Sequence, residues 1–280
     1  MEWLIFFYLK GGVKMLFAID AGNTNTTFAI LAEPGMVRHK WRLQNNALRT
    51  EDEYAGVLLP LITEASLERS DFKGFLLCSV VPGVNQILKN FIQRYFNETL
   101  YVIGEKDVDL PVTSLVDRKE AVGDDRLVNF VGANRRFKES LLVVDFGTAT
   151  TFDFIDENGN HLGGCIAPGA SVTAHALSEA GALLPKLPLS KPEQVIGTWT
   201  IPQMQSGVFW GYVGLFEGLI QRLLDEFMTT RGLTKRPRVI ATGGLSSLFK
   251  DVTDVFDGIF PDLILEGLWH VYTGMNAQKE

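Results

Sequence analysis

The chain has 280 residues, which at about 150 residues per domain predicts two domains and not one small module. Hydrophobic residues make up 46% and charged residues 21% of the chain, so it can bury a sizeable core and is neither disordered nor fibrous. The 26 Lys and Arg residues against 33 Asp and Glu residues give a net charge of −7, and no basic run offers the surface that a phosphate backbone requires, so we expect no nucleic-acid partner.

The N-terminus carries an apolar run, Trp3–Leu9. It is too short to cross a membrane, and it has neither a basic segment before it nor a small-residue cleavage site after it. A clean strand pattern opens at Met15, so we treat residues 1–14 as a possible extension with no assigned role. No other stretch approaches about 20 uninterrupted apolar residues, so we expect no membrane contact. The two widely separated cysteines, Cys78 and Cys165, favour the reducing cytoplasm.

The most informative feature of the sequence is an internal repeat. Residues 17–30 read FAIDAGNTNTTFAI and residues 142–155 read LVVDFGTATTFDFI, so Asp20 and Asp145 occupy matching places. Each copy is an apolar strand that ends in Asp, then a short turn with glycine and hydroxyl residues, then a second strand. The separation of about 125 residues is a normal domain length, so the copies predict two similar α/β domains with a cleft between them.

Alternating helix and strand patterns fill the segment between the two copies, which predicts crossover connections and a largely parallel inner sheet. A capping box at Thr50 and Glu53 opens an amphipathic helix. The expected elements are strands at 37–43, 75–81 and 100–103, and helices at 50–69, 84–96 and 124–138. The last helix would connect the two domains, which we place at 1–137 and 138–280.

In the second half, the pattern predicts a helix from Pro168-Gly169 to about Leu184 and a long helix at about 202–229. A strand at 238–241 follows and ends in Thr242-Gly243-Gly244. The long helix carries glycines spaced 4, 3 and 4 residues apart, which places them on one stripe where another element packs closely. These glycines are Gly207, Gly211, Gly214 and Gly218. Both the domain's own sheet and a second subunit are open as the packing partner.

The sequence contains neither a P-loop nor a dinucleotide fingerprint. The turns at 22–25 and 147–150 instead offer clustered backbone N–H groups, hydroxyls and an amide, which can surround phosphate oxygens without a lysine. Asp20 or Asp145 beside them can organise a cation. For one such turn alone an ordinary tight hairpin with an Asx turn is the better explanation, but two matched copies favour phosphate binding.

A second polar cluster is Gly123-Asp124-Asp125-Arg126, at the predicted start of the 124–138 helix. In isolation it would be a helix cap with a surface ion pair. Phosphoryl transfer to an alcohol needs a carboxylate to accept the hydroxyl proton and a positive group to orient the acceptor, and Asp125 and Arg126 supply both. Consecutive helical residues point about 100° apart, so only one of the two aspartates can face the acceptor.

The motifs together resemble the type III pantothenate kinase family, within the superfamily of acetate and sugar kinases, heat-shock 70 proteins and actin. They occur in the family's order from Met15 onward: Asp20-Ala-Gly-Asn-Thr24, Gly123-Asp-Asp-Arg126, Asp145-Phe-Gly-Thr-Ala-Thr150, Gly163-Gly-Cys-Ile-Ala-Pro-Gly169, Met204-Gln-Ser-Gly207 and Thr242-Gly-Gly244. The resemblance implies an α/β fold of two duplicated actin-like (ribonuclease H-like) domains with mixed central sheets. It also implies transfer of the γ-phosphoryl group of ATP to pantothenate, which gives 4′-phosphopantothenate in the first step of coenzyme A synthesis.

The resemblance also implies roles for individual residues. Asp125 would be the general base, and Gly123, Asp124 and Arg126 would contact pantothenate, with Asp124 in a variable slot. Thr200 would reach pantothenate, in some family members across the interface of a homodimer. Asp145 would bind a monovalent cation, K⁺ or NH4⁺, and Asp20 a magnesium ion that accompanies ATP. ATP itself would be bound by Asp20, Ala21, Gly22, Asn23, Thr24, Asn25, Thr26, Thr27 and Thr148.

The chain departs from the family pattern at Val116, where family members often carry a tyrosine that contacts pantothenate. Two other functions are alternatives to pantothenate kinase activity. Some family members are named as accessory factors for virulence-gene expression, but the acidic charge balance and the intact Asp20, Asp125 and Asp145 argue against a regulatory DNA-binding role. A sugar or acetate kinase of the same superfamily is the other alternative, and Gly123–Arg126 favours the pantothenate kinases.

Overall fold

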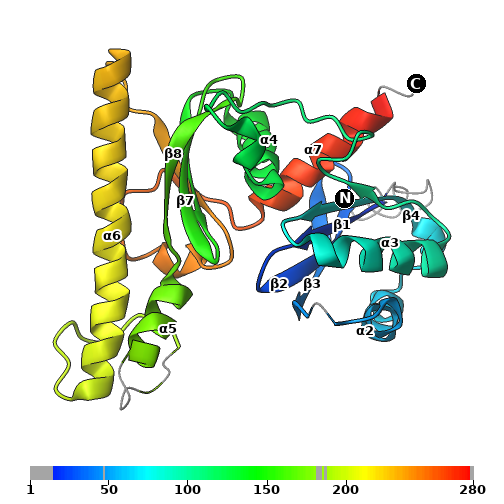
Figure 1. Ribbon diagram of the computed structural model, residues 1–280, viewed down its shortest axis with the longest axis horizontal. Helices are drawn as coiled ribbons and strands as arrows, with labels where there is room; N and C mark the ends of the chain where they lie inside the picture. Colours follow the sequence, from blue (N-terminus) through cyan, green and yellow to red (C-terminus); the bar gives the residue numbers. More distant parts are fainter. Residues whose placement is uncertain (1–14, 47, 181–184, 186–187, 278–280) are drawn as a thin grey trace, which may run out of the picture. The chain divides into compact units, whose positions relative to one another are not determined.

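The computed structural model describes residues 15–46, 48–180, 185 and 188–277, and it divides into two compact units (Figure 1). The first unit contains the residues up to Thr113, then Arg118–Arg136, then the residues from Ile264 onward. The second contains Ser114–Asp117 and Phe137–Leu263. The possible extension at 1–14 lies outside the described residues.

The first unit is built on a mixed five-stranded sheet of order β3-β2-β1-β4-β5. β1 pairs antiparallel with β2, and β2 antiparallel with β3, whereas β4 and β5 run parallel to β1. The strands are β1 (Met15–Ala21), β2 (Asn25–Ala32), β3 (Met36–Gln44), β4 (Phe72–Ser79) and β5 (Tyr101–Val102). Antiparallel hairpins on one side and crossover connections on the other agree with the pattern in the sequence.

The second unit repeats this topology, strand for strand, in a sheet of order β10-β9-β6-β7-β8. β6 and β7 form the hairpin that corresponds to β1 and β2, and β9 and β10 run parallel to β6. The strands are β6 (Leu141–Phe146), β7 (Ala149–Ile155), β8 (His161–Pro168), β9 (Arg238–Thr242) and β10 (Gly258–Ile259). The predicted duplication and the α/β class are confirmed.

Helices α2 (Glu51–Glu64) and α3 (Pro82–Phe96) pack on one face of the first sheet. The core between them is aromatic, with Phe17 and Phe75 of the sheet beside Phe96 of α3. The capping box predicted at Thr50 is present, because the Thr50 N–H donates to Glu53 Oε2 at 2.7 Å and its hydroxyl accepts from the Glu53 N–H. α2 ends earlier than the predicted Arg69, since Ser66 adopts a left-handed φ of 58°.

The C-terminal helix α7 (Leu263–Ala277) belongs with the first unit, although its sequence lies in the second half of the chain. It crosses α4 (Asp124–Phe137) so closely that a Cβ at Gly267 would collide with the Val128 carbonyl. A bidentate ion pair from Arg136 to Glu266 joins the same two helices at 2.8 Å. The sequence predicted one boundary, after residue 137. In the structure the residues from Ile264 onward belong to the first unit instead.

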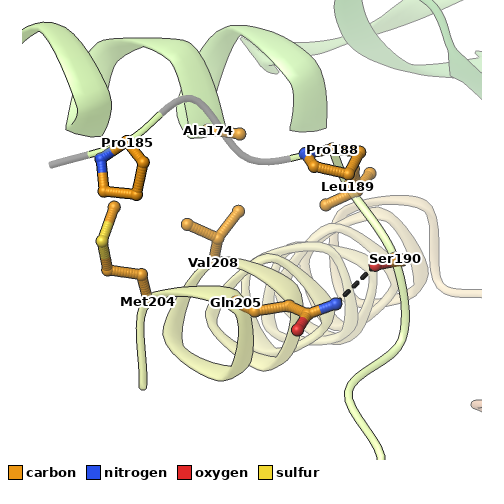
Figure 2. Close-up of a pocket in the computed structure, with 8 residues that line it drawn as sticks. All are labelled: Ala174, Pro185, Pro188, Leu189, Ser190, Met204, Gln205 and Val208. Atoms are coloured by element: carbon orange, nitrogen blue, oxygen red, sulfur yellow. Dashed lines mark hydrogen bonds between the residues drawn. The ribbon is translucent and has the colours of Figure 1, made fainter. Parts of the chain in front are cut away.

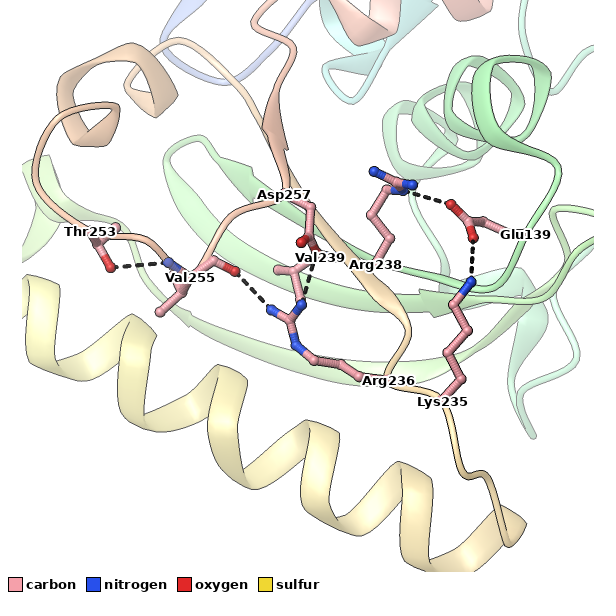
Figure 3. A network of polar contacts seen from close by, with 8 residues as sticks. All are labelled: Glu139, Lys235, Arg236, Arg238, Val239, Thr253, Val255 and Asp257. Atoms are coloured by element: carbon pink, nitrogen blue, oxygen red, sulfur yellow. Dashed lines mark hydrogen bonds and ion pairs between the residues drawn. The ribbon is translucent and has the colours of Figure 1, made fainter.

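In the second unit, the 32-residue helix α6 (Thr200–Arg231) packs against the sheet, and α5 (Ala170–Ala180) contacts its first part. Phe146, Phe216 and Phe249 form the aromatic centre of this core. A polar network joins β9 to the segments just before β6 and β10 (Figure 3). Arg238 donates to Glu139 at 2.6 Å, and Asp257 accepts from the Val239 N–H at 2.7 Å. The Arg238 contact lowers the pKa of Glu139.

None of the helices in the described part of the chain combines the length and apolarity that a membrane crossing needs.

Candidate active site

The first predicted phosphate turn joins β1 to β2 at the end of the first sheet. Gly22 N–H donates to the Asn25 carbonyl at 3.0 Å and closes the turn, whose tip residues Asn23 and Thr24 are exposed. Asp20 precedes the turn on a half-buried position of β1, paired with Thr27 on one side and Cys78 on the other. The tip of the turn thus faces solvent beside one carboxylate, whereas the predicted ATP contacts Ala21 and Thr26 at its two ends are buried.

Asn45, which follows β3, hydrogen-bonds to this turn, and no signal in the sequence indicated this role. Its backbone N–H donates to the Thr24 carbonyl and its side-chain Nδ2 to the Gly22 carbonyl, both at 2.9 Å. The two bonds fix the path of the turn from the residue that follows β3. Nothing in the local sequence marks Asn45, because the bonds depend on the pairing of β3 with β2.

We expect Asn45→Ala to raise the KM for ATP about tenfold, because the lost side-chain hydrogen bond, worth about 0.5–1.5 kcal/mol, loosens the turn proposed to hold the phosphates. The KM for pantothenate should change little. Steady-state kinetics with each substrate varied in turn measures both values, and Asn46→Ala, an exposed neighbour without a bond to the turn, is the matched control. An Asn45→Ala enzyme with an unchanged KM for ATP would contradict this prediction.

The carboxylates of the two adjacent aspartates at the start of α4 have different neighbours. The Asp124 carboxylate covers Gly104, since a Cβ there would lie 2.7 Å from Asp124 Oδ2. The Asp125 carboxylate turns back over Gly123, and its Oδ1 accepts the Arg126 N–H at 2.8 Å. Asp124 is therefore in a packing position against the loop after β5, whereas Asp125 lies at the helix end itself.

Cys78 on β4 lies near three carboxylates of the first unit, those of Asp20, Asp124 and Asp125. Burial raises the pKa of its thiol well above the ordinary range, and the charges of Asp20, Asp125 and Asp124 raise it further. The Asp124 pKa is also raised, first by burial and then by the charge of Asp125. A Cβ at Gly123 would lie 3.7 Å from Val80, which directly follows β4, and Asp20 pairs with Cys78 on β4. The β1 turn and the start of α4 therefore meet around the end of β4, and Cys78 stays a neutral thiol.

The second predicted turn, between β6 and β7, is closed by Gly147 N–H donating to the Ala149 carbonyl at 3.1 Å. Two glycines from distant segments pack on it. A Cβ at Gly243, which has a φ of +87°, would collide with Asp145 Oδ1, and a Cβ at Gly169 would collide with the Thr148 carbonyl. Gly169 of the 163–169 motif and Gly243 of the 242–244 motif are therefore required by their close approach to Thr148 and Asp145.

Thr200 begins α6 in an exposed position, beside the exposed indole of Trp199. Met204 and Gln205, one turn further along, line a crevice with Ala174 of α5, Pro185 and residues 188–190 (Figure 2). With a volume of about 10 Å³, this crevice holds at most one water molecule. It is a packing gap, and neither substrate fits in it.

The segment before the Gly123–Arg126 cluster packs with the second unit. Leu115 N–H donates to the His161 carbonyl at 2.8 Å, and Ser114 Oγ lies 3.1 Å from His161 Nδ1, whose ring also contacts buried Asp153 at 3.2 Å. Val116 lies half-buried two residues further on. The segment that contains Val116 is therefore anchored by the buried histidine His161.

A family model described as type III pantothenate kinase matches residues 16–222. The chain belongs to this family. A type III pantothenate kinase from Paramagnetospirillum magneticum is 45% identical over 92% of this chain and 96% of its own length. The enzyme of the same name from Rhodospirillum rubrum is 47% identical over 91% and 96%.

Solved structures support the fold of this pantothenate kinase family member. A Baf family protein from Campylobacter jejuni is 18% identical, with a TM-score of 0.55, and covers 93% of this chain and 99% of its own. A reductive activator for a corrinoid, iron-sulfur protein has a TM-score of 0.53 at 10% identity, over 96% of this chain and 62% of its own. At these identities the likeness concerns the fold alone.

As in kinases generally, type III pantothenate kinases use ATP with a divalent metal. Among the described residues, no three His, Cys, Asp or Glu side chains converge as a metal cage. Mg²⁺ is held in kinases by one or two carboxylates together with substrate phosphates, and Asp20 offers one carboxylate beside the β1 turn. Asp145, packed against the Gly243 backbone, offers an oxygen ligand of the kind that a monovalent cation takes.

Proposed function

We propose that this chain transfers the γ-phosphoryl group of ATP to pantothenate in line, with Asp125 as general base and no covalent enzyme intermediate. The observation that carries the proposal is the position of the Asp125 carboxylate at the start of α4, in one acidic site with Asp20 and the β1 turn. A base there can accept the hydroxyl proton of the acceptor while the turn binds the phosphates. Arg126 would pair with the pantothenate carboxylate.

ATP would contact the two matched turns, through residues 20–27 of the first and Thr148 of the second. Backbone N–H groups and hydroxyls supply the hydrogen bonds, as expected for phosphate binding without a P-loop lysine. Mg²⁺ at Asp20 would spread the phosphate charge when bound, and K⁺ or NH4⁺ at Asp145 would complete the second turn.

A homodimer is part of the proposal, and α6 would form its seam. Gly207, Gly211 and Gly214 are exposed, and a Cβ added to any of them meets nothing within 4 Å. The described part of this chain therefore leaves the stripe uncovered, which favours the second subunit over the domain's own sheet. Exposed Ile196 and Trp199, just before α6, add apolar surface near Thr200.

A coupled ADP-release assay with ATP, Mg²⁺ and pantothenate tests this proposal, first in sodium and then in potassium or ammonium. We expect turnover that depends on potassium or ammonium, because the proposal assigns such an ion to Asp145. Omission of pantothenate is the control for ATP hydrolysis. No turnover in any salt, with ATP still bound, would instead favour a different acceptor or the regulatory role.

A further inference from the structure

Strand β3 carries a row of basic residues along one edge of the first sheet (Figure 1). Its residues alternate between half-buried and exposed positions, and Trp41 and Leu43 pack on the α2 and α3 side. The exposed positions of the opposite face include Arg38, Lys40 and Arg42. This face is the one on which Asp20 lies, as the strand register shows.

Arg42 is directly opposite Thr27, Thr27 is directly opposite Asp20, and Asp20 is beside Cys78. Side chains that face each other across antiparallel strands point to the same side of the sheet. Two strand spacings separate Arg42 from Asp20, or about 10 Å between Cα atoms. The long guanidinium side chain of Arg42 therefore lies on the same face as the site formed by Asp20 and Asp125.

Arg42 is also the basic residue of β3 nearest the phosphate turn. Gln44, two residues on, pairs with Asn25 at the foot of the turn, and Asn45 bonds to the turn itself. Arg38 lies four residues back, about 13 Å along the strand, beside the irregularity at Ile30 and Leu31. Position along the strand thus distinguishes the two arginines.

Among the described residues discussed so far, none has been assigned as a cationic side chain for the phosphates of ATP. Phosphoryl transfer spreads negative charge over the γ-phosphate oxygens, and kinases meet it with metal ions and with Lys or Arg. Here the carboxylates of Asp20, Asp124 and Asp125 make the site acidic, and Arg126 is assigned to pantothenate. Arg49 is held over the Tyr54 ring, 5.2 Å from its centroid, on the opposite face of the sheet.

We propose that Arg42 is a further catalytic residue, whose guanidinium contacts phosphate oxygens of bound ATP and stabilises the charge that develops during transfer. Basic residues on an edge strand also prevent sheet-to-sheet association, and that role would be shared equally by Arg38. Among the described residues, no ion pair commits Arg42 to an acidic side chain. The inference rests on the proposed function, because it takes ATP to be bound at the β1 turn.

The test compares Arg42→Ala and Arg42→Lys with the matched control Arg38→Ala, an exposed arginine on the same face. We expect Arg42→Ala to lower kcat/KM for ATP about 10²-fold, within the range for loss of one preorganised donor, with the KM for pantothenate within twofold. Arg42→Lys should recover part of the loss, since it restores the charge without the planar fork. Millimolar guanidinium should partly rescue Arg42→Ala, which a structural role would not allow.

Wild-type rates in Arg42→Ala, or an equal loss in Arg38→Ala, would overturn the inference. Calorimetric titration with MgATP alone tests the role of Arg42 independently of whether the enzyme acts on pantothenate. If the wild type binds ATP without acting on pantothenate, weaker ATP binding by Arg42→Ala than by Arg38→Ala supports Arg42, and equal binding overturns it. Circular dichroism checks that each variant is folded.

Discussion

Asp125→Asn is expected to lower kcat by about 10²–10⁴-fold, the contribution of a positioned general base, while ATP binding stays nearly unchanged. The amide has the shape of the carboxylate but cannot accept the hydroxyl proton of pantothenate. Its oxygen can still accept the Arg126 N–H, as Asp125 Oδ1 does at 2.8 Å, so the start of α4 should keep its geometry. Stopped-assay kinetics and titration with MgATP measure the two quantities.

Asp124→Asn is the matched control, because it removes one negative charge from the same helix turn. The Asp124 carboxylate packs over Gly104, whereas the Asp125 carboxylate lies over Gly123, so we expect a change of a few-fold at most. An active Asp125→Asn enzyme would refute the base. Equal losses in both variants would mean that the charge of the cluster matters and that no single carboxylate accepts the proton.

Much of this fold follows from local sequence. The two hairpins were predictable because each combines period-two apolar strands with a glycine turn. The two strands of each hairpin are neighbours in the sequence, so a short segment contains the whole pattern. The repeat also predicted that the two domains share one topology, but the order of the strands within each sheet comes from the structure. The start of α2 was predictable from Thr50 and Glu53, whose side chains bond within one turn.

The features that the sequence did not reveal depend on contacts between distant segments. Asn45 acts through strand register, and α7 joins the first unit through a close crossing with α4 at Gly267. Ser114 meets His161 across 47 positions of sequence. For the glycine stripe of α6, the pattern indicated close packing but could not name the partner. The direction of each aspartate at 124 and 125 likewise depended on what lay beside the helix.

Gly211→Leu is expected to separate the proposed dimer while leaving the protomer folded. Within the described chain, a Cβ at Gly211 meets nothing within 4 Å, and replacement of a mid-helix glycine by a good helix former favours the helix by about 1 kcal/mol. In a two-fold interface the new leucine is present on both subunits. Two leucine side chains then occupy the interface where each subunit had a glycine. Size-exclusion chromatography with light scattering measures the loss.

Gly56→Leu on α2 is the matched control, because Gly56 is also exposed, mid-helical and open around its Cβ. Both variants should keep or raise the thermal midpoint, so a change of oligomeric state confined to Gly211→Leu would report contacts between subunits. Thr200 lies on the same helix as the stripe. If it reaches pantothenate across the seam, the separated Gly211→Leu protomers should lose most of their activity while still binding ATP, whereas a Gly211→Leu protein that stays dimeric would remove α6 from the interface.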